Sequence, residues 1–299
     1  MAISITDIKK VLILGSGTLG LRIGLQAALS GFEVIIYDIN ESVFESAKKT
    51  QASILTWLIS KEVITTEESD EALKKISFTI DAVSAAKDAD FVSESVIEDL
   101  GIKKKVWSQF STLCPAHAIF TTNTSYLMPS QFAAETGRPE RFCAFHFHDV
   151  FTANVVDIMP HPTTDQWVSD LLMEMGTKLK QTPVFVKKES PGYIFNAMLV
   201  ALIGAAGALV TYDVASIEDV DRSWIGNFKM DIGPFGILDN IGLETAWHVT
   251  KNLPDAKSQK FAALLKTYVD AGKLGVKTGE GFYKYPNPTF QDKNFVQKD

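Results

Sequence analysis

The sequence predicts an α/β fold, a mostly parallel sheet with helices on both faces, followed by a smaller all-α domain. An apolar run at residues 11–14 enters a glycine-rich turn, short apolar strands then alternate with helical segments, and no clear strand follows Tyr193. Alternating strands and helices are typical of a parallel sheet. The length of 299 residues also suggests two domains. We place their boundary at residues 188 and 189, where a charged run precedes a Pro-Gly pair.

Apolar segments and helical spacing predict the remaining elements. A helical pair with a break at residues 60–66 is expected between residues 41 and 75. Further strands are expected at residues 76–80, 91–93, 118–121, 141–147, 155–159 and 184–186. Residues 193–212 form a helix that is apolar on nearly all sides, which fits either the central helix of a bundle or half of a dimer interface.

The glycine-rich turn has the spacing G-x-G-x-x-G, formed by Gly15, Gly17 and Gly20. The first glycine permits a tight turn, the second lets a pyrophosphate approach the backbone, and the third lets the helix pack on the strand. The first helical turn, with Thr18 and Leu19, then directs its N–H groups at the phosphates. The alternative is a glycine-rich turn in an unrelated α/β protein, because the motif alone is a weak signal.

The next strand, expected at residues 33–37, ends at Asp38. A carboxylate at this distance from the glycines can accept hydrogen bonds from an adenosine ribose. The three residues after Asp38 are Ile39, Asn40 and Glu41, so no Arg or Lys stands there to neutralise a 2′-phosphate. The sequence therefore predicts a Rossmann-type domain at residues 1–188 that binds NAD in preference to NADP.

Composition argues against several other classes of protein. The net charge of −7 and pI of about 5.3 argue against nucleic acid as a partner. Cys114 and Cys143 form neither a disulfide framework nor a zinc motif, so no metal site is indicated. The longest apolar run, residues 197–210, is too short to span a bilayer, and the N-terminal apolar run is too short for a signal peptide. We expect a cytoplasmic protein.

Polar residues follow two of the expected strands. Small hydroxyl and amide groups in residues 121–125, among them Asn123, can face a nicotinamide or a substrate. His146 emerges at the end of the strand at residues 141–147, where it can act as a general base or be a packed, satisfied histidine. Asp157 lies out of pattern in a later apolar segment, and a nearby histidine is its expected partner.

From about Lys9 to Tyr285 the chain resembles the L-3-hydroxyacyl-CoA dehydrogenase family. The glycine loop with Asp38 carries the resemblance together with ESVIEDLGIKKKVW, TTNTSYL, RPERFCAFHF, SPGYIFNAML, DIGPFGILDNIGLET and KTGEGFYKY. The resemblance implies a general base at His146, a carboxylate that orients it, here Asp157, and polar contacts from Ser125 and Asn196 to the reacting oxygen.

The resemblance also implies contacts outside this catalytic set. It implies that Glu98 contacts the cofactor. It places the CoA near the helical pair, so Lys48 and Lys49 are expected to contact a CoA phosphate. Residues 103–105, three consecutive lysines, are expected to be a solvated helix face rather than a phosphate contact.

The chain departs from the family pattern beside the proposed base. The family's His-Phe-Phe-Asn-Pro is replaced by His-Phe-His-Asp-Val at residues 146–150, its Glu by Asp157, and its Gly by Ala144. We expect either that Asp149 turns away and is neutralised by His148, or that the substrate is not a simple short acyl-CoA.

The predicted function is an NAD-dependent oxidoreductase that interconverts a short 3-hydroxyacyl-CoA and its 3-ketoacyl-CoA. The alternatives are a dehydrogenase of a non-CoA hydroxy acid and a non-catalytic NAD-binding protein. The second domain, residues 189–299, is expected to serve substrate binding and dimerisation, so a homodimer is expected.

Overall fold

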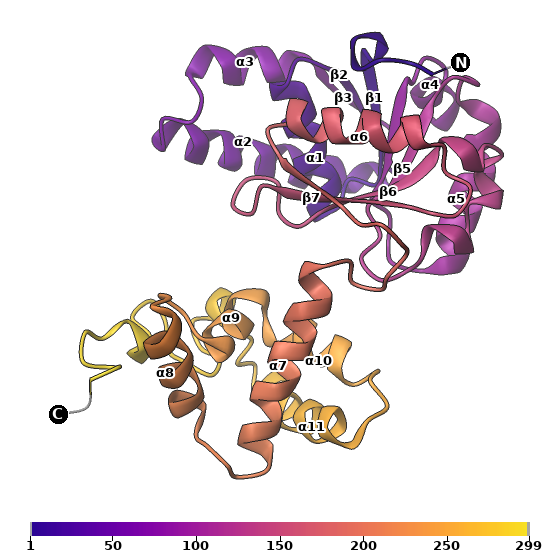
Figure 1. Cartoon of the computed structure of the whole chain (residues 1–299). Coiled ribbons are helices and arrows are strands. Elements are labelled where there is room, and N and C mark those ends of the chain that lie inside the picture. Colours follow the sequence, from indigo (N-terminus) through magenta and orange to yellow (C-terminus); the bar gives the residue numbers. More distant parts are fainter. Residues whose placement is uncertain (1, 298–299) are drawn as a thin grey trace. The chain divides into compact units, whose positions relative to one another are not determined.

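The computed structural model describes residues 2–297, and the chain divides into two compact units between Ile194 and Phe195 (Figure 1). The sequence-based boundary lies earlier, at residues 188 and 189. The first unit contains a sheet of eight strands and the second is helical.

The sheet of the first unit has the strand order β3-β2-β1-β4-β5-β6-β7-β8. Among the described strands, only the β6–β7 pair is antiparallel, and all other neighbouring pairs are parallel. The strands are β1 (Lys10–Leu14), β2 (Glu33–Tyr37), β3 (Ile76–Thr79), β4 (Phe91–Glu94), β5 (Ile119–Thr122), β6 (Phe142–Phe147), β7 (Val155–Pro160) and β8 (Thr182–Phe185). The expected strands are all present, with ends that differ by at most two residues. The prediction of a Rossmann-type, mostly parallel sheet is therefore confirmed.

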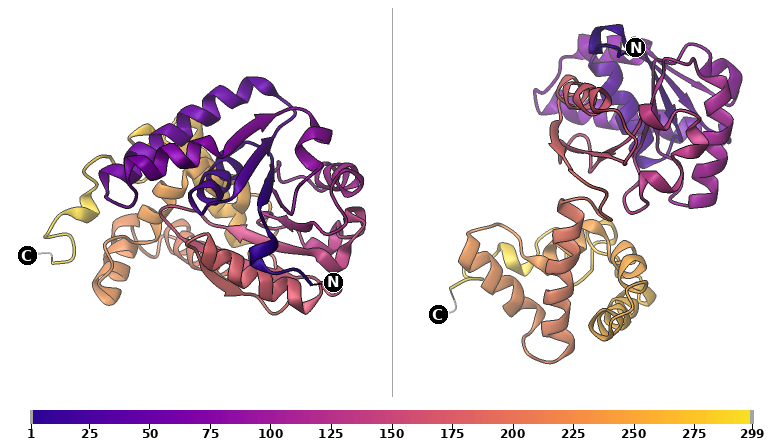
Figure 2. Two further views of the ribbon diagram at one scale, coloured as in Figure 1. Left: turned by 90° about the horizontal axis from the view of Figure 1, so that it is seen from above. Right: turned by 45° about the vertical axis from the view of Figure 1, so that its right-hand side comes forward.

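Helices cover both faces of this sheet (Figure 2). The helices of the first unit are α1 (Thr18–Leu29), α2 (Phe44–Ser60), α3 (Thr66–Lys74), α4 (Ala82–Ala86), α5 (Leu100–Leu113) and α6 (Gln166–Lys178). One face packs against α1 and α6, and the other against α4 and α5. The expected helical pair is α2 and α3, which pack against α1.

Local sequence explains where these elements begin. β1 is fully apolar after Lys10 and is buried from Val11 to Leu14, as expected for a central parallel strand. α3 begins with a capping box: Thr65 Oγ1 accepts a hydrogen bond from the Glu68 N–H (3.1 Å), and the Thr65 N–H donates to Glu68 Oε2 (2.8 Å). Such caps satisfy N–H groups that lack a partner within the helix.

The second unit packs its helices around an apolar core. They are α7 (Phe195–Thr211), α8 (Ile217–Phe228), α9 (Pro234–Ile241), α10 (Leu243–Thr250) and α11 (Ala256–Asp270). α7 is the long apolar helix expected from the sequence, but only Ile203, Ala206 and Gly207 in it are buried. No helix within residues 2–297 is both long and apolar enough to cross a membrane.

Two buried aspartates fasten the turns of this unit. Asp221 accepts hydrogen bonds from the N–H groups of Phe235 (2.9 Å) and Gly236 (3.0 Å), at the start of α9. Asp239 accepts them from the N–H groups of Phe282 (2.8 Å) and Tyr283 (2.9 Å). Burial raises the pKa of both carboxyl groups, although these hydrogen bonds favour the ionised form.

Candidate active site

The glycine loop between β1 and α1 has the shape that a dinucleotide needs. Gly15 has φ +100°, a conformation that favours glycine, and a Cβ on Gly20 would lie 1.9 Å from the Gly15 carbonyl oxygen. A Cβ on Gly17, in contrast, would meet nothing within 4 Å, and Gly17 and Thr18 are exposed. Gly17 is also the N-cap of α1 and supplies no side chain to its first N–H groups. The loop therefore leaves space and hydrogen-bond donors where a pyrophosphate would bind.

Asp38 also fixes this loop. Its Oδ2 accepts hydrogen bonds from the Ser16 N–H (2.8 Å) and the Ser16 hydroxyl (2.7 Å), and its Oδ1 accepts one from the Asn40 N–H (3.2 Å). An aspartate accepts several hydrogen bonds at once, so these contacts do not use up its acceptor capacity. Its contact with an adenosine ribose, and the preference for NAD over NADP, stay predictions.

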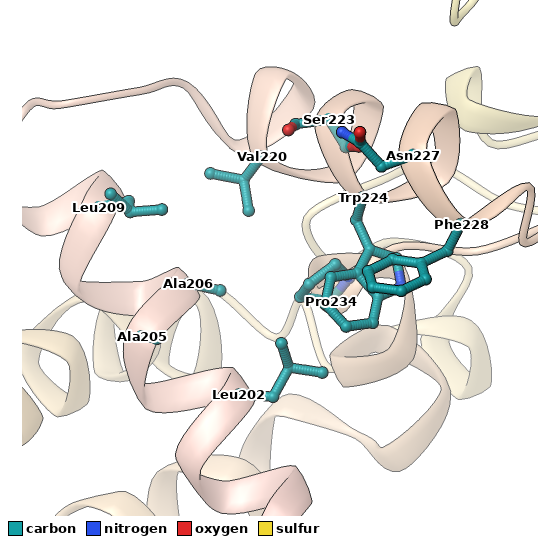
Figure 3. Close-up of a pocket in the computed structure, with 10 residues that line it drawn as sticks. All are labelled: Leu202, Ala205, Ala206, Leu209, Val220, Ser223, Trp224, Asn227, Phe228 and Pro234. Atoms are coloured by element: carbon teal, nitrogen blue, oxygen red, sulfur yellow. The ribbon is translucent and has the colours of Figure 1, made fainter.

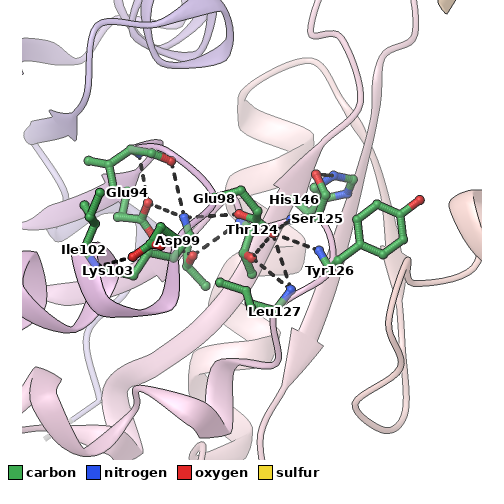
Figure 4. Close-up of polar contacts among 12 residues, drawn as sticks. Glu94, Glu98, Asp99, Ile102, Lys103, Thr124, Ser125, Tyr126, Leu127 and His146 are labelled. Atoms are coloured by element: carbon green, nitrogen blue, oxygen red, sulfur yellow. Dashed lines mark hydrogen bonds and ion pairs between the residues drawn. The ribbon is translucent and has the colours of Figure 1, made fainter. Parts of the chain in front are cut away.

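The polar segment after β5 is held by Glu98 (Figure 4). One oxygen, Oε1, accepts hydrogen bonds from the Thr124 hydroxyl (2.6 Å) and from the N–H groups of Ser125 (3.0 Å) and Tyr126 (3.0 Å). Lys103 lies 3.5 Å from the other oxygen. Burial would raise the pKa of Glu98, but Lys103 and these hydrogen bonds lower it overall. Glu98 therefore positions the segment that carries Ser125, and its contact with the cofactor stays a prediction.

Lys103 corrects one expectation from the sequence. It is 1% exposed rather than solvated, and its Nζ lies 2.6 Å from Oε1 of Glu94, a fully buried residue at the end of β4. Lys104, in contrast, is partly exposed and pairs with Glu135. Lys103 is buried because it follows the same helical stripe as Trp107 and faces two carboxylates.

His146 has a partner on each ring nitrogen. Nδ1 lies 3.3 Å from Asp157 Oδ2, and Nε2 lies 3.2 Å from the Ser125 hydroxyl. The register of β6 and β7 pairs His146 directly with Asp157, and the end of β5 brings Ser125 to the same edge of the sheet. Burial lowers the pKa of His146, although the hydrogen bond to Asp157 opposes this effect. A neutral imidazole between a carboxylate and a hydroxyl can accept a proton at Nε2.

Tyr193, which is not among the expected site residues, completes this arrangement. Its ring stacks on the imidazole of His146 with centroids 4.5 Å apart and planes 8° apart. Its hydroxyl donates a hydrogen bond to the Thr124 carbonyl (2.6 Å), and burial raises its pKa well above 10. Tyr193 has φ +55° and follows Gly192, so a tight turn directs the ring. The SPGY sequence was the available signal.

His148 and Asp149 do not pair with each other, so the expectation that His148 neutralises Asp149 is wrong. His148 Nε2 lies 2.9 Å from Asp157 Oδ2, because residues 146 and 148 project from the same side of the chain. Asp149 instead forms an ion pair with Arg22 of α1, and its Oδ1 accepts hydrogen bonds from the N–H groups of residues 151 and 152. Burial would raise the pKa of Asp149, but these contacts lower it overall.

His146, His148 and Asp157 are the one cluster with metal-ligand chemistry found among residues 2–297, with one atom of each within 4.8 Å of the others. The two contacts to the carboxylate, 3.3 and 2.9 Å, have the length of hydrogen bonds from ring N–H groups. Ring N–H groups that donate to Asp157 Oδ2 are sufficient to hold this arrangement.

Two family models together match almost the whole chain. The NAD-binding domain of 3-hydroxyacyl-CoA dehydrogenase matches residues 10–190, and the C-terminal domain of 3-hydroxyacyl-CoA dehydrogenase matches residues 192–285. The chain belongs to the 3-hydroxyacyl-CoA dehydrogenase family. The family expected from the motifs is thus confirmed, and so is NAD as the cofactor. As an NAD-dependent dehydrogenase of this family, the chain is an enzyme and not a non-catalytic NAD-binding protein.

Individual members of the family, and structures similar to this chain, differ in what they act on. The chain is 32% identical to a 3-hydroxybutyryl-CoA dehydrogenase of Bradyrhizobium diazoefficiens, over 94% of this chain and 98% of that one. Among solved structures, a diketoreductase that acts on dicarbonyl compounds has a TM-score of 0.89 and 39% identity, over 93% of this chain and 99% of that one. The (S)-3-hydroxybutyryl-CoA dehydrogenase of Ralstonia eutropha has a TM-score of 0.82 and 30% identity, over 94% and 100%.

The other expected site residues are Asn123, Lys48, Lys49 and Asn196. Asn123 is buried, and its side-chain oxygen accepts the N–H of Phe147 (2.8 Å), which ties β5 to β6. Lys48 and Lys49 are exposed on α2, where Lys49 pairs with Glu45. Asn196 lies in the second unit, at the start of α7. Contacts of these residues with cofactor or substrate stay predictions.

Proposed function

We propose that the chain oxidises the 3-hydroxyl of a short 3-hydroxyacyl-CoA to the ketone, and catalyses the reverse reduction, with His146 as the base. The observation that carries the proposal is the imidazole held between Ser125 and Asp157 at the edge of the sheet where β1 enters the glycine loop. Ligands of such sheets bind at the carboxyl ends of the strands. The family relatives named as 3-hydroxybutyryl-CoA dehydrogenases support the same substrate class.

Each side chain has a definite task in this reaction. NAD, when bound, would supply the hydride acceptor for the carbon that carries the hydroxyl. His146 Nε2 takes the hydroxyl proton, and Nδ1–H donates to Asp157, whose charge stabilises the protonated ring. The Ser125 hydroxyl can donate a hydrogen bond to the reacting oxygen, and Asn196 is proposed as a second donor. Because burial lowers the pKa of His146, oxidation should persist at pH values below 6.5.

Consumption of NADH with acetoacetyl-CoA tests this proposal. His146→Ala should lower kcat by roughly 10²–10⁴-fold, the usual contribution of a general base, with NAD affinity unchanged. His248→Ala is a matched control, because His248 is exposed on α10 in the second unit. Wild-type turnover in the His146 variant would contradict the assigned base.

A second candidate is a non-CoA 1,3-dicarbonyl compound or the hydroxy compound formed from it. The identity of 39% to the diketoreductase, against 32% and 30% to the two CoA dehydrogenases, favours this candidate. Ethyl acetoacetate carries the same 3-oxo group as acetoacetyl-CoA but no CoA. A higher kcat/KM for the ester would favour the second candidate, whereas a preference for the thioester would favour the first.

We also propose that the chain forms a homodimer through the second unit. A groove between α7, α8 and α9 is lined mostly by apolar side chains, among them Leu202, Leu209, Trp224 and Phe228 (Figure 3). Leu209 is 41% and Phe228 64% exposed, so this face leaves large apolar side chains in water. A second copy of the chain offers the matching apolar surface, because a two-fold contact uses the same patch on both subunits.

Sedimentation velocity tests this assembly. The wild type should sediment as a dimer, and Phe228→Asp should sediment as a monomer. Val214→Asp is the control, because Val214 is 68% exposed but does not line the groove. A monomeric wild type would exclude the homodimer.

We further propose a cytoplasmic location, with which the two unpaired, buried cysteines are compatible.

A further inference from the structure

We propose that His148 is a positioning residue that shares one oxygen of Asp157 with His146 and thereby sets the pH range in which His146 accepts a proton. This inference rests on the proposed role of His146 as the base. It assigns a function to a residue at which the chain departs from the family motif.

Both imidazoles reach the same atom. His148 Nε2 lies 2.9 Å from Asp157 Oδ2, and His146 Nδ1 lies 3.3 Å from it. The side chain of Asp157 is 2% exposed and that of His148 is 11% exposed, so water screens neither contact strongly. The two rings are close, with centroids 4.8 Å apart and planes 78° apart. His148 therefore makes the shorter of two competing contacts to a buried carboxylate.

The carboxylate of Asp157 determines which ring nitrogens of the two histidines carry a proton. An ionised carboxylate has no hydrogen to donate, so both ring nitrogens that face Oδ2 must carry one. His146 then bears its proton on Nδ1 and presents the Nε2 lone pair to Ser125, which is the tautomer that a base needs. His148 bears its proton on Nε2. One carboxylate oxygen thus selects the tautomer of both histidines.

The shared oxygen also weakens the effect of Asp157 on His146. A hydrogen bond from His148 stabilises the negative charge of Asp157, so less of that charge is available to stabilise a protonated His146. A protonated His148 would in addition repel a protonated His146. Both effects of His148 lower the pKa of His146, and both add to the effect of burial.

Other groups face His146 from the neighbouring elements. Asp157 on β7 and Glu98 after β4 raise its pKa, because both carry negative charge. Ser125 after β5 and the stacked ring of Tyr193 before α7 are uncharged. Among these described groups, only His148 lowers the pKa of His146, and it contacts the same Oδ2 atom of Asp157 that His146 contacts.

Two substitutions of His148 distinguish the effect of its hydrogen bond to Asp157 from the effect of its aromatic ring. His148→Phe keeps an aromatic ring but removes the donor and the titratable group. His148→Gln keeps an N–H donor without a titratable group. We expect the pKa on the acidic limb of kcat/KM for alcohol oxidation to rise by about one unit in the Phe variant, which lowers kcat/KM about tenfold below both pKa values. The Gln variant should lie between this and the wild-type profile.

Nuclear magnetic resonance of the ring nitrogens gives a readout that does not depend on turnover. In the wild-type protein, His146 should be protonated on Nδ1 and His148 on Nε2 at neutral pH. The pKa of His146 in the free enzyme should rise in His148→Phe by the same amount as in the kinetic profile. A His148 ring whose Nε2 carries no proton would overturn the proposal in the wild type, even if the variants fail to fold.

The remaining outcomes are also decisive. An acidic limb that coincides in His148→Phe and wild type would overturn the proposal, and so would equal shifts in the Phe and Gln variants, because the donor would then have no effect. Failure of the proposed function has a different signature. It would appear as wild-type turnover in His146→Ala, whereas the nitrogen spectra would still report on His148.

Discussion

The buried pair of Lys103 and Glu94 gives the sharpest test of how the first unit holds its active-site segment. Replacing Lys103 with Met keeps the length and the apolar stem of the side chain but removes the charge. Glu94 would then stay buried without its cation, and Glu98, which holds residues 124–127, would lose the ammonium 3.5 Å from its second oxygen. The variant should therefore lose both stability and activity.

The size of the effect follows from burial. Lys103 is 1% and Glu94 0% exposed, and removing one partner of such a pair typically costs about 3–5 kcal/mol. Glu94 keeps two hydrogen bonds, from the Val96 N–H (2.9 Å) and the Thr122 hydroxyl (2.6 Å), so the lower end applies. At roughly 2–4 °C per kcal/mol for a unit of this size, Tm should fall by about 6–12 °C.

Differential scanning calorimetry and kcat/KM measured on the same preparations test this expectation. Lys104→Met is the matched control, because its pair with Glu135 is partly exposed and should contribute less than about 1 kcal/mol. The double variant Lys103→Met, Glu94→Gln removes both charges and should recover much of the lost Tm. A Tm within 2 °C of wild type for Lys103→Met, where a fall of about 6–12 °C is expected, would contradict this expectation. So would a double variant that is no more stable than the single one.

Three further predictions concern the cofactor loop and the stacked ring. Gly20→Ala should lower Tm and NAD affinity together, because its Cβ would lie 1.9 Å from a carbonyl oxygen, whereas Gly17→Ala should weaken NAD binding at an unchanged Tm; fluorescence quenching and calorimetry distinguish the two. Asp38→Ser with Ile39→Arg should move the cofactor preference towards NADP, and equal affinities of the wild type for both cofactors would show that the carboxylate does not face the ribose. Tyr193→Leu should lower kcat about tenfold or more with the KM for NAD unchanged, because the imidazole loses the ring that fixes its plane, and an unchanged kcat would remove that role.

The sequence predicted the elements of the first unit because their signals are local. β2 begins and ends at the expected residues, since an apolar run bounded by polar residues needs no partner to be visible. The pairing of His146 with Asp157 was also predictable, because a carboxylate inside an apolar strand needs a partner. Contacts between distant residues were not. Nothing in either segment links Arg22 with Asp149, which are 127 positions apart.

The predictions for Lys103 and His148 were wrong because they used residue type or sequence neighbourhood and not the periodicity of the helix or strand. The lysine run suggested a solvated face, but Lys103, Trp107 and Phe110 share a helical spacing of three and four residues that marks the buried stripe of α5. His148 was paired with its neighbour in sequence, although an alternation of two along a strand places it on the side of His146. Burial periodicity was more informative than residue type in both cases.

The stacked tyrosine has a mechanical consequence. Tyr193 is the penultimate residue of the first unit, and α7 begins two residues later. The polypeptide therefore leaves the first unit from a side chain that is fixed by the carbonyl of Thr124 and by the imidazole of His146. Tension along the connecting segment would act on the ring beneath the base before it reached any strand of the sheet. Rotation of this ring would tilt the imidazole on which it stacks, so the segment by which the chain leaves the first unit also orients the base.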